Sequence, residues 1–193
     1  MRIEPVRLDG DSVRLEPLRQ DHAEGLYHRG RSAADWSYMP RACFIDLADV
    51  RQWIDEALAA PAQLPFAILE TDRNRVIGST RYLNIRPEHR SLEIGWTWLG
   101  QQWQRTGVNT QVKLLLLTHA FERLGCVRVE FKTDARNLRS QRALERIGAT
   151  REGVLRKHMI VQDGYVRDSV YFSVIDSDWP EVMGRLELLR ERC

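Results

Sequence analysis

The chain has 193 residues, a length that favours one domain over two. Its 29 Lys and Arg residues nearly balance 27 Asp and Glu residues, and the net charge of +2 argues against a nucleic-acid binder that relies on broad phosphate neutralisation. No apolar run approaches the roughly 20 residues of a membrane span, and no secretory signal opens the chain, so we expect a cytoplasmic protein with no membrane partner. The few, unclustered cysteines and scattered histidines predict neither a disulfide framework nor a metal site.

Apolar periodicity and turn residues divide the chain into groups of strands and helices. Asp21 with Glu24 has the spacing of a capping box, and Asp46 with Asp49 opens a second helix. The aromatic segment 34–40 between these helices is expected to be a loop. In chain order the expected elements are a strand at 12–18, helices at 21–31 and 46–58, strands at 66–71, 76–83 and 91–99, a helix at 110–124, a strand at 127–133, a helix at 138–147, strands at 154–161 and 166–175, and a helix from 178. This order predicts an α/β fold with a mixed, mostly antiparallel sheet, because a doubly wound parallel sheet needs strands and helices to alternate throughout.

The segment from Glu93 to Thr110 carries the strongest functional signal. A strand runs into a short loop with one glycine, and a long helix follows at once. The first turn of a helix has unpaired N–H groups and favours negative charge, so this loop is suited to a pyrophosphate. Gly107 lets the backbone approach closely, Thr106 and Thr110 offer hydroxyl groups, and Arg105 offers charge. The alternative is an ordinary strand-to-helix turn with a capping threonine.

Two polar residues follow the next strand. Asn137 is a good helix cap, or its side-chain amide bonds an amide-rich ligand between the strands. Ser140 lies in the first turn of that helix, and its alternative is a capping or solvated serine.

Together these motifs resemble the GNAT superfamily of N-acetyltransferases, and within it the RimJ/RimL-like branch. Gln104-Arg-Thr-Gly-Val-Asn109 resembles the acyl-CoA loop, and Glu93-Ile-Gly-Trp-x-Trp-Leu resembles the strand before it. Asn137-x-x-Ser140, with Ile147-Gly-Ala after it, resembles the segment that follows. The resemblance runs in order over about residues 11 to 180. Asn109 departs from the usual Gly or Ala, and Leu144 stands where many members carry a tyrosine that protonates the leaving thiolate.

The resemblance implies one domain over residues 1–193, with a GNAT-like sheet flanked by helices and splayed between its fourth and fifth strands. Acetyl-CoA would be the cosubstrate, with no metal, and its pantetheine arm would bond to the strand like an added strand. The residues expected to bind it are Trp98, Leu99, Gln104, Arg105, Thr106, Gly107, Val108, Asn109, Thr110, Asn137 and Ser140.

The resemblance also implies direct transfer of the acetyl group to a primary amine, either a protein or peptide N-terminus or a small molecule. Glu93 is the candidate base, and its alternative is a charged residue on a solvated sheet face. Ser140 would take the place of the proton donor to sulfur, and N–H groups near Leu99 would polarise the carbonyl. The candidate acceptor lining is Trp36, Tyr38, Met39, Arg81, Tyr82 and His158.

Other functions remain open from sequence alone. A non-catalytic module that binds and senses coenzyme A is the main alternative to an enzyme. Cys126 is expected to be a small buried residue and not an acyl carrier. The six tryptophans exceed what a core of this size needs, which would fit a homodimer interface.

Overall fold

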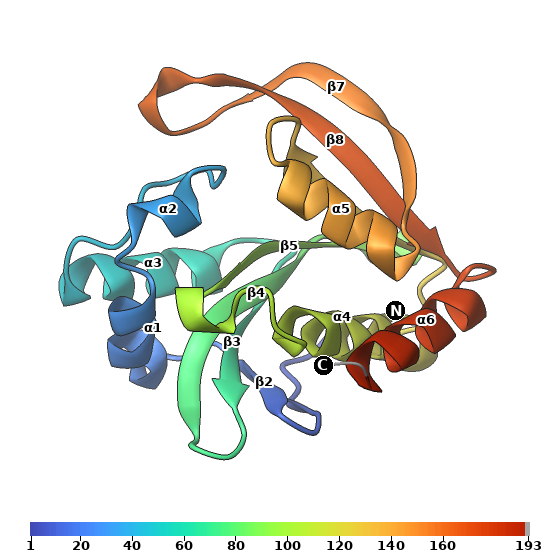
Figure 1. Cartoon of the computed structure of the whole chain (residues 1–193), viewed down its shortest axis with the longest axis horizontal. Helices are drawn as coiled ribbons and strands as arrows, with labels where there is room; N and C mark the ends of the chain where they lie inside the picture. The colour runs from blue at the N-terminus through green and yellow to red at the C-terminus, as the bar shows by residue number, and fades with distance from the viewer. Residues whose placement is uncertain (192–193) are drawn as a thin grey trace.

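The computed structural model describes residues 1–191 and contains, within them, an eight-stranded sheet in the order β1-β2-β3-β4-β5-β6-β8-β7 (Figure 1). The strands are β1 (Leu8–Asp9), β2 (Val13–Pro17), β3 (Leu64–Glu70), β4 (Arg75–Arg86), β5 (Ser91–Leu99), β6 (Arg128–Asp134), β7 (Thr150–Ile160) and β8 (Val166–Ile175). The helices are α1 (Ala23–Arg29), α2 (Ala33–Trp36), α3 (Leu47–Ala59), α4 (Val108–Thr118), α5 (Leu138–Ile147) and α6 (Trp179–Glu191). Neighbouring strands are antiparallel except for the parallel pair β5–β6, which confirms the predicted mixed, mostly antiparallel α/β sheet.

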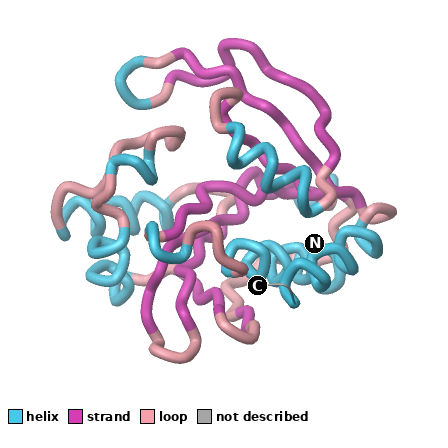
Figure 2. Tube along the Cα trace, in the orientation of Figure 1, coloured by secondary structure: helices cyan, strands magenta, loops and turns pink. Residues whose placement is uncertain are grey.

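The sheet is splayed between β5 and β6. The two strands pair only over 91–93 and 128–130. Beyond Glu93 and Glu130 the strands diverge, so β5 over 94–99 and β6 over 131–134 have no ladder partner across the gap within the described chain. The tube in Figure 2 shows the two halves of the sheet separating at this point. Because these are the fourth and fifth long strands in chain order, the predicted splay is confirmed.

Helices cover both faces of the first half of the sheet. Ala67 and Leu69 pack on one face with α1, α2 and α3, whereas Phe66 and Ile68 pack on the other face with α4. Both faces of β3 are therefore buried, which explains its continuous apolar run. On β6 only one face joins this core, through residues such as Phe131, while the alternate residues are polar.

Several predicted boundaries were right. Asp46 caps α3 by accepting a hydrogen bond from the Asp49 N–H (2.8 Å), and α5 has the predicted bounds. Gly148 ends α5 with a φ of +95°, a left-handed conformation that glycine adopts without a steric penalty.

The start of the chain's helical region differs from the prediction. Asp21 is exposed, and the cap before α1 is formed instead by the Arg19 N–H, which donates to His22 Nδ1 (3.1 Å). Helix α1 ends at Arg29 because the chain turns at Gly30, where a Cβ atom would lie 2.4 Å from the Phe44 ring. The predicted aromatic loop contains the short helix α2.

Five of the six tryptophans are buried: Trp36, Trp53, Trp98, Trp103 and Trp179. They fill the core, so the tryptophan count no longer supports a dimer interface. Within the described residues, no helix is long and apolar enough to cross a membrane.

Candidate functional site

The unpaired edge of β5 carries a backbone irregularity next to the gap. Ser79 pairs with Trp98 and Arg81 pairs with Gly95, so two residues of β5 oppose Thr80 alone. This is a β-bulge, and Trp96 within it has a φ of +51°, which is costly for a residue with a side chain. Strained backbone of this kind clusters at functional sites, and here it lies where the sheet opens.

The predicted phosphate loop leads from this edge into α4. Helix α4 begins at Val108, two residues before the predicted start, and Gly107 is its N-cap. Within residues 1–191 the N–H groups of Gly107, Asn109 and Thr110 donate to no protein acceptor. Arg105 has a φ of +62°, so the left-handed turn of the loop falls there, while Gly107 has an ordinary φ of −65°. The loop therefore presents free donors at a helix N-terminus, as an anion requires.

The side chains of the loop are less available than predicted. The Thr106 hydroxyl donates to the Trp103 carbonyl (2.7 Å) and accepts from the Val108 N–H (3.3 Å). Thr110 is only 1% exposed. Gln104 Nε2 donates to the carbonyl of Leu99 (2.9 Å) and to Asp35 (2.6 Å), so it ties the loop to β5 and α2. These contacts make Thr106 and Gln104 structural supports of the loop.

Helix α5 brings arginines to the same loop, which the sequence analysis did not identify. Arg139 Nη1 donates to Gln104 Oε1 (2.8 Å), and Arg146 Nη2 lies 3.5 Å from Thr110 Oγ1. Asn137 caps the helix by accepting from the Ser140 N–H (3.0 Å). The signal was the spacing of Arg139, Arg142 and Arg146, which places them on one helix face.

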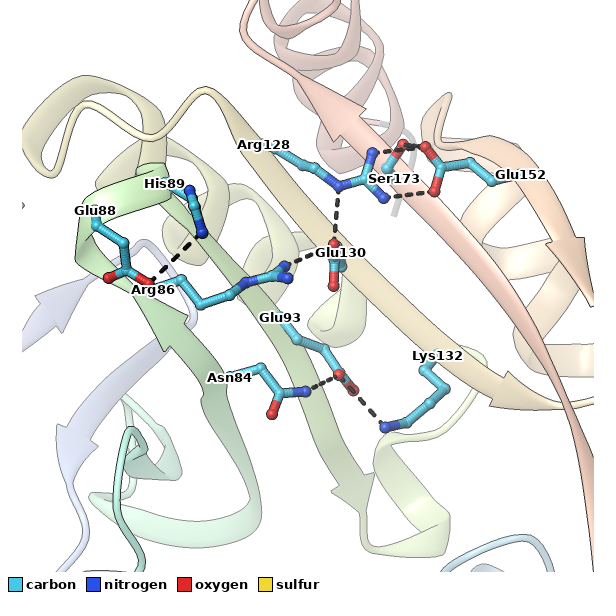
Figure 3. Close-up of polar contacts among 10 residues, drawn as sticks. All are labelled: Asn84, Arg86, Glu88, His89, Glu93, Arg128, Glu130, Lys132, Glu152 and Ser173. Atoms are coloured by element: carbon cyan, nitrogen blue, oxygen red, sulfur yellow. Dashed lines mark hydrogen bonds and ion pairs between the residues drawn. The ribbon is translucent and has the colours of Figure 1, made fainter. Parts of the chain in front are cut away.

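Glu93 lies at the last paired position of β5, where the gap begins. It is only 2% exposed, so the alternative of a solvated sheet face is wrong. As Figure 3 shows, its Oε2 atom accepts from Asn84 Nδ2 (2.8 Å) and lies 3.5 Å from Lys132 Nζ. A neighbouring network, in which Arg128 bonds both Glu130 and Glu152, holds β6 to β7 (Figure 3). Glu93 is thus a buried carboxylate with a fixed orientation.

His158 on β7 belongs to the surroundings of Glu93. Its Nδ1 atom lies 3.1 Å from Ser169 Oγ, and its ring packs edge-on against Tyr171. Burial, together with the charges of Lys132 and Arg167, lowers the pKa of His158, while the charge of Glu93 opposes this change. The histidine is therefore predominantly neutral at pH 7.

The tip of the β7–β8 hairpin meets the segment that follows α2. Gln162 Nε2 donates to the Trp36 carbonyl (2.6 Å). The guanidinium of Arg136 lies 3.5 Å from the centre of the Tyr165 ring and 5.7 Å from that of Tyr38. Tyr38 and His158 thus lie on segments that face each other beyond the end of β6.

Trp36 and Tyr82 do not have the surroundings of an acceptor lining. Both are fully buried. The Trp36 Nε1–H donates to the Gly30 carbonyl (2.9 Å), and the Tyr82 hydroxyl donates to the Leu116 carbonyl of α4 (2.6 Å). Arg81 is also buried, with its guanidinium stacked between the rings of Trp53 and Trp96. We therefore withdraw Trp36 and Tyr82 as acceptor contacts, because neither offers surface to a ligand.

Lys113 of α4 is a second residue that the sequence analysis missed. It is 6% exposed, its Nζ donates to Thr97 Oγ1 on β5 (3.2 Å), and burial lowers its pKa to about 7. Thr110, Lys113 and Leu117 follow helical spacing and are all buried. A lysine within a buried stripe was the signal available in the sequence.

A cavity of about 430 Å³ lies beside the start of the loop. It is lined by His28, Arg29, Arg31, Ser32, Asp35 and the segment 100–103. Within the described residues, no group of three or more His, Cys, Asp or Glu side chains could hold a metal ion.

A family model for the acetyltransferase (GNAT) domain matches residues 12–150, which is more than half of the chain. The chain therefore belongs to the GNAT family, and it is an acetyltransferase by fold and by relationship.

Solved and curated relatives agree with this. The chain is similar to a GCN5-related N-acetyltransferase from Brucella melitensis, with 30% identity and a TM-score of 0.91 over 96% of this chain and 86% of that one. It is 40% identical, with a TM-score of 0.90, to a protein from T. thermophilus assigned by inference to the acetyltransferases, over 97% of this chain and 98% of that one. It is 27% identical over 179 residues to YjcK of Bacillus subtilis strain 168, described as a probable N-acetyltransferase, covering 89% of this chain and 98% of YjcK.

Proposed function

We propose that this acetyltransferase moves the acetyl group of acetyl-CoA directly to a primary amine. The observation that supports this most strongly is the free edge of β5 beyond Glu93, which leads into the unpaired N–H groups of Gly107, Asn109 and Thr110. An extended, amide-bearing arm fits a strand edge, and a diphosphate fits a helix N-terminus.

The donor site consists of backbone groups with cationic support. Trp98 and Leu99 would offer backbone groups to the arm, while Arg105, Val108, Arg139 and the N-terminus of α4 surround the phosphates. Arg146 adds charge on the α5 side. A protein with a similar fold, a spermidine N-acetyltransferase from Vibrio cholerae at 16% identity and a TM-score of 0.73, was solved in complex with CoA and spermine.

The reaction requires an unprotonated amine and a polarised carbonyl. Glu93 is the proposed base, acting directly or through water, because it is buried at the start of the gap and anchored by Asn84. A positioned base contributes about 10²–10⁴-fold to the rate. Backbone N–H groups of the bulge at 96–99 would polarise the carbonyl. Ser140, which caps nothing through its hydroxyl in the described structure, would donate a hydrogen bond to the sulfur.

The acceptor binds, in this proposal, on the face of the sheet that carries Glu93 and His158. Tyr38 at the facing segment remains in the proposed lining. A peptide N-terminus, as in the RimJ/RimL-like branch, and a small amine both match this site.

The test combines binding and turnover. Calorimetry with CoA should register binding that is lost when Gly107 is replaced by Val, since a branched side chain would stand among the free N–H groups. Release of free thiol from acetyl-CoA is then followed with a panel of peptides and small amines. The matched control is Gly184→Val in α6, where an added Cβ meets nothing within 4 Å.

The outcomes separate the alternatives. Thiol release that depends on an amine supports the transferase, which family membership favours over a sensor. Tight CoA binding without thiol release from any amine would support the non-catalytic sensor. An absence of CoA binding would refute both.

A further inference from the structure

Lys113 lies at the floor of the gap between β5 and β6. Its Nζ bonds Thr97 on β5 and lies 5.3 Å from the centre of the Phe131 ring on β6. Since strand pairing stops at Glu93 and Glu130, Phe131 is the first residue of β6 beyond the paired region. Lys113 therefore reaches both strands at the point where they separate.

Packing alone does not account for this lysine. An ammonium group has three donors, and within residues 1–191 the Thr97 hydroxyl is its hydrogen-bond acceptor, with no carboxylate within 4.0 Å. The Phe131 ring offers a cation–π contact and no proton acceptor of comparable strength. A buried cation without a counter-ion destabilises a fold, and such groups concentrate at functional sites.

We propose that Lys113 is a catalytic residue that stabilises and protonates the sulfur leaving from acetyl-CoA. This inference rests on the proposed function, because that function brings the thioester into the gap. The position where many relatives carry a tyrosine acid is Leu144, which is 6% exposed and packs in the core. Lys113 supplies a proton donor from the opposite side of the gap, on α4 instead of α5.

The proton balance of the step is complete. The neutral amine forms a C–N bond to the carbonyl carbon, and collapse of the adduct breaks the C–S bond with its electron pair on sulfur. The Lys113 ammonium transfers one proton to that sulfur and becomes a neutral amine. The acceptor nitrogen loses one proton to Glu93 or water, and Lys113 regains a proton from solvent. Burial lowers the pKa of Lys113 to about 7, so this transfer is not costly near neutral pH.

The decisive experiment compares CoA with desulfo-CoA, which lacks the thiol. Calorimetry is run on the wild-type protein, on Lys113→Met, and on the control Lys157→Met, an exposed lysine of β7. We expect the wild type and the control to bind CoA about tenfold or more tightly than desulfo-CoA, since a charge-assisted bond of about 1.4 kcal/mol gives that ratio. Lys113→Met should bind both ligands equally, with the affinity for desulfo-CoA unchanged.

Absorption and kinetics provide two further readouts. Binding of CoA at neutral pH should produce the ultraviolet absorption of a thiolate in the wild type and not in Lys113→Met. The same variant should lose about 10²-fold in kcat with little change in the KM for acetyl-CoA, and Lys113→Arg, which keeps a charge, should retain thiolate absorption but recover little turnover.

Two results would overturn the proposal in distinguishable ways. If the wild type binds CoA and desulfo-CoA with equal affinity, Lys113 does not contact the sulfur and the proposed function still stands. If neither ligand binds the wild type, the proposed function fails first, and the role of Lys113 fails with it.

Discussion

Replacing Lys113 with Met should stabilise the protein while it impairs the reaction. The pKa of this lysine falls from an ordinary 10.5 to about 7 on burial, which corresponds to an unfavourable contribution of about 5 kcal/mol at about 1.4 kcal/mol per tenfold change in affinity for the proton. Met has an unbranched stem and fits the same space, and the hydrogen bond to Thr97 that is lost contributes about 1 kcal/mol. We therefore expect Lys113→Met to raise the free energy of unfolding by about 2 to 4 kcal/mol near pH 6.

The gain should depend on pH in a defined direction. Between pH of about 7 and 10.5 the unfolded lysine holds a proton that the folded lysine has released, so the stability of the wild type rises with pH over this window. The variant has no such group, and its advantage should fall toward zero by about pH 9.5. Urea unfolding at both pH values measures the difference, with Lys157→Met as the exposed control, for which we expect less than about 0.5 kcal/mol. A variant that is less stable than the wild type near pH 6 would refute the reasoning.

Further changes test other parts of the site. Glu93→Gln should lower kcat by about 10²–10⁴-fold and flatten the rise of rate with pH; an unchanged profile removes Glu93 as the base. Asn137→Ala should cost about 1 kcal/mol of stability because it removes the cap on the Ser140 N–H, whereas Asn137→Asp should keep that stability, as thermal unfolding would show. Arg146→Ala should raise the KM for acetyl-CoA with little change in kcat, and a raised KM for the amine instead would place Arg146 on the wrong side of the site. Tyr82→Phe should cost about 1 kcal/mol through the lost bond to Leu116 and leave the KM for every amine unchanged; a changed amine KM would restore Tyr82 to the acceptor lining.

Local sequence patterns were sufficient where local forces dominate. Helix α5 was predicted with its true bounds because a cap at Asn137 and a left-handed Gly148 mark both ends. The loop before α4 was recognised because a strand, a glycine and a helix start follow within a few residues. The first helix was misplaced because two acidic residues have the spacing of a cap, but the chain uses His22, whose buried ring lies close to Glu16.

The candidate site divides along the same line. Glu93 was identified from its strand, yet its burial depends on Asn84 and Lys132, which other strands supply. Trp36 and Tyr82 were assigned to a cleft because aromatic residues suit one, although each closes a core contact that no local pattern shows.

The sequence by itself determined the types and order of the elements, the glycine-bearing loop at a helix start, and the resemblance to an acetyltransferase family. Tertiary structure alone decided which side chains meet across the gap. Periodicity and capping depend on residues a few positions apart, whereas the environment of Lys113 depends on β5 and β6, two strands that are separated by α4 in the chain and that stop pairing just where the lysine reaches them.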